Sequence, residues 1–460
     1  MSRGIKKSLI ALSVSGVLFA PSAFATNGYF AHGYSTTEKG LAGAGVAHSQ
    51  DAMAIATNPA GIAGMGERMD VGAALFSPKR SYTTSGAPSD QCGAFGCSFS
   101  LTEGEVDSNL ELFLIPHFAY NWALDSDTSF ALAAYGNGGM NSNYKTGQAR
   151  FSPAQDGNFA TFDGTFGANV AGGSGTTGVD LKQLFINASY AIKLNQEHSV
   201  GASLIFAYQT FEAKGLEAFA GFSSDPANLT GNGPDSSTGF GVKLGWQGKI
   251  APSVTLGASY QSKMSMGEFD DYAGLFAEGG GFDIPATATI GLSWKTSDKS
   301  TLVVDIQSIY YSDVASLNNS IQQMLPSSGL GLCNPAASPA AGPGCLGGAS
   351  GAGFGWDDMT VIKLGYEWMS GDMTYRVGVS NGSQPIPDGE VMFNILAPAV
   401  METHITGGFT MPLGSNSELA FAAMYAPSNS VSGGNPLDGA QTIEIEMDQI
   451  ELQATYSMMF

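Results

Sequence analysis

The last eleven residues of the chain, Ile450 to Phe460, alternate between apolar or small and polar side chains. Successive side chains of a β-strand point to opposite sides, so a period of two indicates a strand with two different faces. Only Met459 breaks the pattern. One face carries Ile450, Leu452, Ala454, Tyr456, Met458 and Phe460, and the other carries Gln449, Glu451, Gln453, Thr455 and Ser457.

The opposite end of the chain has the pattern of a secretory signal peptide. Arg3, Lys6 and Lys7 precede an apolar run from Leu9 to Phe19, and Ala23-Phe24-Ala25 follows as a cleavage pattern. We therefore expect residues 1–25 to be removed. No later run approaches the roughly 20 apolar residues of a spanning helix. A membrane crossing by the mature chain then requires a closed barrel, because only helices and barrels satisfy their backbone hydrogen bonds in lipid.

Composition agrees with an exported β-protein. The net charge of −21 makes nucleic acid an unexpected partner, and charged residues form only 13% of the chain. Four cysteines form two local pairs in Gly- and Pro-rich stretches, which in an exported chain favours disulfides over a zinc site. The predicted disulfides are Cys92–Cys97 and Cys333–Cys345.

Beyond residue 68 the alternating pattern recurs along the whole chain, with Tyr and Trp near the segment ends, as in the aromatic girdles of membrane barrels. Clear examples are the segments 110–122, 184–194, 200–208, 240–246, 254–260, 286–294, 362–368 and 419–425. Short and long connections alternate between them. The long ones are 81–105, 139–178, 214–236, 269–283, 314–354, 382–398 and 428–440.

Six short turns and seven long loops predict an all-β fold, a 14-stranded antiparallel transmembrane barrel over residues 68–460. The charged side chains have a consistent parity within these segments. They fall opposite the apolar set, which is expected because a charge facing lipid costs roughly 2–4 kcal/mol. The inward-facing set is Lys193, Lys243, Lys263, Lys295, Lys363, Arg376, Asp305, Glu367, Glu402 and His404.

The last strand contains one conflict. Ile443, Ile445 and Met447 have the parity of the polar face, whereas Glu444, Glu446 and Asp448 have that of the apolar face. Two explanations are open. Either a bulge near Asp448 or Gln449 shifts the register, or the strand projects above the membrane with an apolar inner face.

Residues 26–67 do not alternate. Asp51 is a candidate N-cap of a short helix through Ile55 that Asn58-Pro59 would end. About forty residues are too few for an independent domain, so this segment needs a surface, and a barrel interior supplies one.

The segment resembles the N-terminal hatch of FadL-type outer-membrane transporters of long-chain fatty acids and other hydrophobic compounds. The resemblance lies in Gly40 to Gly45, Asp51-Ala52, Asn58-Pro59-Ala60-Gly61 and Met65, with Asn-Pro-Ala as the family signature. The terminal Phe460 is similar to the assembly signal of outer-membrane barrels. The resemblance implies fourteen strands, a plug inside the barrel, and an inward kink in the third strand. The matching region, 135–140, contains Gly136, Gly138 and Gly139, which could permit such a kink.

Enzyme-like motifs are better explained as barrel features. Gly378-Val379-Ser380-Asn381-Gly382 fits a nucleophile elbow but lies within an alternating strand, and 173–178 fits a dinucleotide fingerprint but precedes a strand. The five histidines show no metal-ligand spacing. We therefore expect no enzyme, no cofactor and no metal site.

The resulting hypothesis is passive uptake of a hydrophobic small molecule by a monomer in the outer membrane, surrounded by outer-membrane lipid. An aqueous porin for polar solutes and a surface adhesin with long external loops are the alternatives. A fatty acid would need a cation for its carboxylate, and the candidates are Lys243, Lys263, Lys363 and Arg376. A hydrocarbon would need none. Asn58, Pro59 and Ala60 of the plug and Gly136, Gly138 and Gly139 of the wall are the predicted gating residues.

Overall fold

Antiparallel strands close into a barrel in the computed structural model, which describes residues 27–93, 96–173, 175–325 and 332–460. Consecutive strands are hydrogen-bonded neighbours, and the pairing of β1 with β21 completes the ring. The described residues thus confirm the predicted 14-stranded barrel. Its strands are β1 (Arg68–Ser85), β6 (Phe113–Ala123), β7 (Thr128–Asn141), β10 (Gly178–Lys193), β11 (His198–Lys214), β12 (Asp235–Ala251), β13 (Val254–Gln261), β15 (Thr287–Ser297), β16 (Ser300–Ile309), β17 (Met359–Ser370), β18 (Met373–Gly382), β19 (Thr403–Pro412), β20 (Ser417–Asn435) and β21 (Asp438–Met459).

The two faces of the wall differ as the alternation predicts. Val242 and Leu244 on β12 are 48% and 57% exposed, whereas Lys243 between them is 5% exposed and points into the barrel. Large apolar side chains on the outer surface are those that lipid would cover. The nucleophile-like motif at 378–382 lies in β18, as a strand rather than a turn. Among the described residues, no helix has the length and hydrophobicity to span a membrane.

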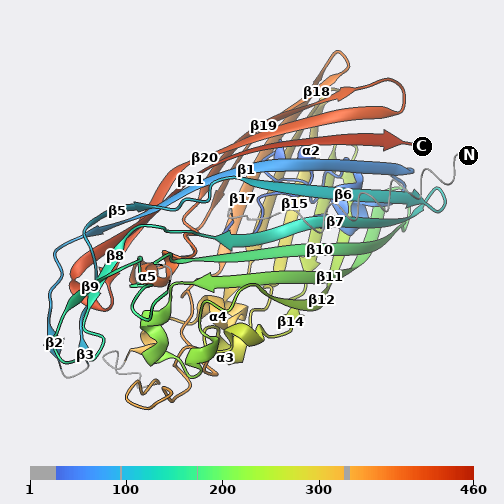
Figure 1. The fold of residues 1–460 in the computed structure, drawn as a ribbon. Coiled ribbons are helices and arrows are strands. Elements are labelled where there is room, and N and C mark those ends of the chain that lie inside the picture. The colour runs from blue at the N-terminus through green and yellow to red at the C-terminus, as the bar shows by residue number, and fades with distance from the viewer. Residues whose placement is uncertain (1–26, 94–95, 174, 326–331) are drawn as a thin grey trace, which may run out of the picture.

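The two ends of the barrel are unequal (Figure 1). Short turns join the strands at the end where the C-terminus lies, and larger connections with small strands and helices gather at the other end, called the loop end here. One prediction of a long connection is wrong. Residues 428–440 belong almost entirely to β20 and β21, which extend beyond the other strands and are joined by Pro436-Leu437.

The parity conflict in β21 is resolved in favour of an apolar inner face. The register between β1 and β21 runs without a shift from Arg68 to Ser85. The pairing with β20 does shift between Ala426 and Asn429, opposite Asp448, but the extra residue lies in β20, so the alternation of β21 itself continues. Ile443, Ile445 and Met447 are buried on the same face as Gln449 and Glu451. The inner surface of β21 therefore changes from polar near the C-terminus to apolar near the loop end.

The loop end contains short elements and two disulfides, Cys92–Cys97 and Cys333–Cys345. Its strands are β2 (Cys92–Gly93), β3 (Gly96–Cys97), β4 (Phe99–Leu101), β5 (Gly104–Asp107), β8 (Gln148–Phe151), β9 (Ala160–Asp163) and β14 (Ser265–Met266). Its helices are η3 (Glu217–Phe222), η4 (Pro226–Asn228), η5 (Asp270–Tyr272), α3 (Ala277–Gly280), η6 (Tyr311–Asp313), α4 (Ala315–Asn318), η7 (Ile321–Met324), η9 (Asp388–Glu390) and α5 (Val391–Asn394).

Residues 27–67, called the hatch here, lie inside the barrel, where α2 is surrounded by strands (Figure 1). The hatch contains α2 (Thr36–Lys39), η1 (Ala52–Ala56) and η2 (Pro59–Ile62). The predicted cap is only partly correct. Asp51 occupies the N-cap position of η1, but its side chain makes no capping bond and accepts a hydrogen bond from Thr37 Oγ1 at 2.7 Å. The Ala52 N–H instead donates to Asp70 on β1, at 2.7 Å.

Glycines on the inner wall allow the hatch to approach the strands closely. A Cβ on Gly201 of β11 would lie 2.5 Å from the Pro59 carbonyl carbon, and one on Gly245 of β12 would lie 2.0 Å from Asn58 Oδ1. Asn58 also donates to the carbonyl oxygen of Trp246 at 3.0 Å. The Asn-Pro-Ala motif is therefore docked against β11 and β12. Gly257, Gly291, Gly365 and Gly378 make similar close approaches to hatch atoms.

Candidate ligand cavity and hatch

An apolar cavity lies at the loop end. Among the described residues, Ser316 contributes the single polar side chain of its lining. Apolar pockets with few polar groups are typical of small-molecule sites. The other lining residues come from barrel strands, η3, α5 and the connections: Val179, Phe211, Leu216, Phe219, Leu275, Phe276, Leu346, Ala352, Gly353, Phe354, Phe393 and Leu396.

A series of aromatic contacts joins this cavity to the hatch. The ring of Phe276, in the cavity wall, lies 4.9 Å from that of Phe282, and Phe282 lies 6.2 Å from Tyr29 of the hatch. Tyr29 is fully buried. Aromatic rings at these separations are in van der Waals contact, so a continuous series of packed rings joins the cavity wall to the hatch.

The start of the hatch is hydrogen-bonded to a bulge in β7. Against β10, the register of β7 skips Asn137. The Asn137 carbonyl oxygen instead accepts from the Ala31 N–H at 3.1 Å, and the Gly139 N–H donates to the Tyr29 carbonyl at 3.0 Å. A Cβ on Gly138 would lie 2.1 Å from that same Tyr29 oxygen. The predicted glycine-rich segment is therefore the place where wall and hatch share backbone hydrogen bonds.

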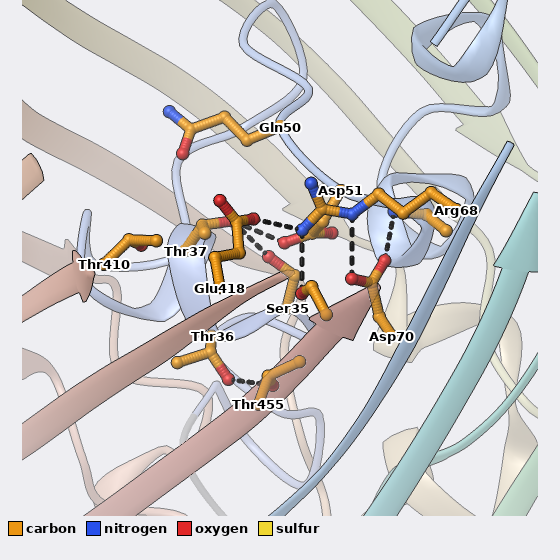
Figure 2. A network of polar contacts seen from close by, with 12 residues as sticks. Ser35, Thr36, Thr37, Gln50, Asp51, Arg68, Asp70, Thr410, Glu418 and Thr455 are labelled. Atoms are coloured by element: carbon orange, nitrogen blue, oxygen red, sulfur yellow. Dashed lines mark hydrogen bonds and ion pairs between the residues drawn. The ribbon is translucent and has the colours of Figure 1, made fainter. Parts of the chain in front are cut away.

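Charged groups also tie the hatch to β1 and β20 (Figure 2). Arg68 Nε donates to Asp70 Oδ1 at 2.8 Å, and Arg68 Nη2 donates to Glu418 Oε1 at 2.6 Å. Since Asp70 also accepts from Ala52 of η1, the network connects β1 and β20 to the hatch. Burial of an ion pair is stabilising only when the remaining donors and acceptors are also satisfied. Here Arg68 also donates to Ser457 Oγ, and the second oxygen of Asp70 accepts from the Ala52 N–H.

Residues 151–441 match the family described as "Outer membrane protein transport protein (OMPP1/FadL/TodX)". The chain belongs to this family. It is therefore an outer-membrane barrel of a family of transport proteins, not of enzymes. No curated protein matches the chain in a sequence comparison.

Solved structures show the same fold at low sequence identity. The P. putida toluene transporter TodX is 17% identical, with a TM-score of 0.63 over 93% of this chain and 99% of that one. A Pseudomonas aeruginosa FadL homologue is 15% identical, with a TM-score of 0.63 over 94% and 100%. The Ralstonia pickettii toluene transporter TbuX is 15% identical, with a TM-score of 0.57 over 93% and 99%.

In this FadL/TodX-family barrel, none of the four predicted ligand cations lines the apolar cavity. Lys243 donates to the Ala56 carbonyl, and Lys363 to the carbonyls of His32 and Gly43 at 3.0 and 3.3 Å. Arg376 binds Glu367 at 2.8 Å and Gln50 at 2.6 Å. Lys243 and Lys363 therefore contact backbone carbonyls of the hatch, and Arg376 contacts the side chain of the hatch residue Gln50.

The fourth cation, Lys263, lies apart from the others. It is partly exposed, forms an ion pair with Asp283 at 2.9 Å, and donates to the Asp313 carbonyl at 2.7 Å. The structure thus brings Lys243 and Lys363 to one region between hatch and wall but does not bring the four cations together.

The alternating pattern does not predict the aromatic residues of the cavity, because the long connections of such a barrel are expected to be external loops. One signal was present. Phe219, Phe276, Phe354 and Phe393 all fall in those connections, where large apolar side chains have no reason to recur unless they bury one another.

Proposed function

We propose that this FadL/TodX-family protein carries hydrophobic small molecules passively across the outer membrane, with the apolar cavity as their binding site. The observation that supports this proposal is the composition of the cavity, whose lining, as far as the structure describes it, has no charged side chain and one hydroxyl. Burial there removes apolar ligand surface from water, which contributes about 0.8 kcal/mol per methylene.

The cavity suits an uncharged hydrocarbon, either a whole molecule or the hydrocarbon part of a larger one. A buried carboxylate without a cation would cost several kcal/mol, so an acid would have to place its head group outside the cavity. The toluene transporters among the structural neighbours are consistent with a hydrocarbon ligand.

Release requires the bound molecule to be displaced. A chain of about fifteen methylenes would gain ~12 kcal/mol from burial, and a site of that affinity would release its ligand slowly. The aromatic contacts from Phe276 through Phe282 to Tyr29 connect the cavity wall to the hatch. We infer that the hatch, with Asn58, Pro59 and Ala60 against β11 and β12, and the β7 segment with Gly136, Gly138 and Gly139, form the gate.

Filling the cavity tests the proposal. Ala352 is buried in the cavity wall, so Ala352→Trp should abolish uptake of radiolabelled toluene and of a labelled long-chain fatty acid by whole cells. Ala160→Trp, at an exposed position of β9, is the matched control. Uptake that survives in Ala352→Trp at the level of the control would contradict the assignment of the cavity.

Two further measurements separate substrate classes. Substituting Lys243, Lys263, Lys363 and Arg376 singly by Met should reduce uptake of the fatty acid and spare toluene if a carboxylate is held by one of them. Liposome swelling with small sugars tests the porin alternative. Rapid swelling by the wild-type protein would favour an open aqueous pore, whereas a seated hatch predicts slow swelling.

A further inference from the structure

A second space, called the recess here, lies beside η3 at the loop end. Its volume is about 490 Å³, which is within the range of small-molecule sites. The side chain of Phe219 in η3 lines both the recess and the apolar cavity, so the two spaces share a wall. The proposed function does not use the recess.

Phenylalanine side chains form much of the apolar lining of the recess. Phe99, Phe151, Phe219 and Phe222 all contribute to it. The ring of Phe99 lies 4.8 Å from that of Phe151 and 5.5 Å from that of Phe219. The face of an aromatic ring is electron-rich and attracts a nearby cation, more strongly where water is excluded. This lining therefore suits an apolar ligand body and is compatible with a positive charge beside it.

The polar side chains of the recess differ in whether they are already bound. Apart from the disulfide-bonded Cys97, those in the described lining are Ser98, Gln155 and Glu217. Ser98 Oγ accepts from the Gln91 N–H at 3.3 Å, and Gln155 Oε1 accepts from the Cys97 N–H. Glu217, at the start of η3, is the only charged side chain in the lining that the structure describes.

Glu217 is a partly buried carboxylate without a counter-charge. Its Oε2 atom is buried and has no hydrogen-bond partner, and it forms no ion pair within the described part of the chain. The loop-end cations Arg150 and Lys214 are paired with Asp90 and Glu212 instead. Burial raises the pKa of Glu217 above its ordinary value. Since buried charges in proteins are normally paired, this carboxylate leaves a position for a cationic donor.

We propose that the recess binds an organic ammonium ion, a protonated primary amine with an apolar body. The ammonium group pairs with the Glu217 carboxylate, and the phenylalanine side chains cover the apolar body. Glu217 repels a carboxylate at the same position, so the recess favours an amine over an acid of equal size. Only onward passage of the amine past Phe219 into the apolar cavity rests on the proposed function.

Benzylamine is the probe, because at neutral pH it carries an ammonium group on a body of one aromatic ring. Benzyl alcohol and phenylacetate are its neutral and anionic counterparts. Fluorinated analogues of all three are titrated with the full mature protein in lipid nanodiscs and followed by fluorine NMR, with empty nanodiscs as the blank. The amine should bind about tenfold more tightly than the alcohol, because a hydrogen bond to a charged group contributes about that factor. Phenylacetate should bind more weakly than either.

Glu217→Gln keeps the shape of the side chain and removes its charge. This variant should bind the amine about tenfold more weakly than the wild-type protein does. Its affinity for the alcohol should be unchanged, which shows that the recess is still folded. Glu105→Gln, at an exposed position of β5, is the matched control and should bind the amine like the wild-type protein.

Three results would overturn the proposal: an amine that binds no more tightly than the alcohol, an amine affinity unaffected by Glu217→Gln, or an equal loss for amine and alcohol in that variant. Since the titration requires no transport, its failure is distinct from failure of the cavity test with Ala352→Trp.

Discussion

Lys39 of the hatch and Glu451 of the last strand form an ion pair inside the barrel, with Nζ 2.5 Å from Oε1 and side chains 4% and 2% exposed. The pair joins α2 to β21, segments separated by 412 positions in sequence. Since both charges are withdrawn from water, each depends on the other. The hatch is therefore held to the final strand by an interaction that cannot be broken without leaving a buried charge.

Lys39→Met should loosen the hatch. Removal of one partner of a buried ion pair typically costs about 3–5 kcal/mol, and here the cost falls on the contact between α2 and β21. The expected result is a higher single-channel conductance in planar lipid bilayers than for the wild-type protein.

Two variants control this experiment. Arg150→Ala breaks a partly exposed ion pair with Asp90 at the loop end and should leave the conductance unchanged. The double variant with Lys39→Met and Glu451→Gln, which leaves no unpaired charge, should recover much of the wild-type behaviour. If Lys39→Met conducts like the wild-type protein, the ion pair does not seat the hatch.

Gly138 determines how closely the hatch approaches β7. A side chain there would meet the Tyr29 carbonyl oxygen at 2.1 Å, and this atom is backbone, so the hatch rather than a flexible side chain must move. Gly138→Ala should therefore break the hydrogen bonds of Tyr29 and Ala31 to β7 and expose residues 27–31 to hydrogen exchange.

The matched control is Gly439→Ala, where an added Cβ meets no atom within 4 Å. Hydrogen-exchange mass spectrometry of the hatch peptides compares the two variants directly. Equal protection of residues 27–31 in both would show that the contact at Gly138 is not required.

The wall of the barrel was predictable because lipid imposes a simple rule on it. Every second residue of a spanning strand must be apolar. The alternation in the sequence of β12 and β21 therefore shows which side chains face the lipid and which face the lumen. The rule fails beyond the membrane. There Ile443, Ile445 and Met447 turn inward against other loop-end residues, and the acidic positions between them face outward. Residues 428–440 were predicted to be a loop because no lipid constrains their pattern.

The site was less predictable because it is built from contacts between distant segments. The Asn-Pro-Ala motif located the hatch. Its close packing against Gly201 and Gly245 depends on the register between β11 and β12, which cannot be predicted from a local sequence pattern. Parity placed Lys363 inside the barrel correctly. It could not reveal that the Lys363 ammonium group donates hydrogen bonds to the carbonyl oxygens of His32 and Gly43.

The disulfide Cys333–Cys345 constrains the connection that closes the apolar cavity. Cys345 is fully buried, and its neighbour Leu346 lines the cavity. A disulfide that closes a loop of this size restricts the unfolded ensemble by about 3 kcal/mol. Replacing both cysteines by Ser should increase hydrogen exchange in residues 332–354 and lower the affinity for toluene.

The pair Cys92–Cys97 supplies the comparison. It joins β2 to β3, and neither cysteine lines the apolar cavity. Its double Ser variant should keep the wild-type affinity for toluene, measured by displacement of a fluorescent hydrophobic probe. If the two double variants lose the same affinity, the effect comes from a general loosening of the loop end and not from the cavity wall.

Glu390, in the connection between β18 and β19, makes the loop end sensitive to pH. Its carboxylate accepts from Ser320 Oγ at 2.5 Å and from the Ile321 N–H at 3.0 Å, which ties η9 to η7. Burial raises the pKa of Glu390 above its ordinary value of 4.5, although both hydrogen bonds act in the opposite direction. The folded loop end therefore binds the Glu390 proton more tightly than an unfolded chain does.

The sign of the pH effect follows from this proton. With a raised pKa in the folded state, the stabilisation is complete below pH 4.5 and is lost as pH rises from 4.5 through the folded-state pKa. The slope in that window is at most about 1.4 kcal/mol per pH unit.

Opening free energies of residues 314–325 and 388–396, from hydrogen exchange corrected for intrinsic rates, should fall with rising pH in the wild-type protein. Glu390→Gln should remove this fall, whereas Glu105→Gln, at an exposed position of β5, should retain it. A slope that is the same in all three proteins would mean that another group carries the pH dependence.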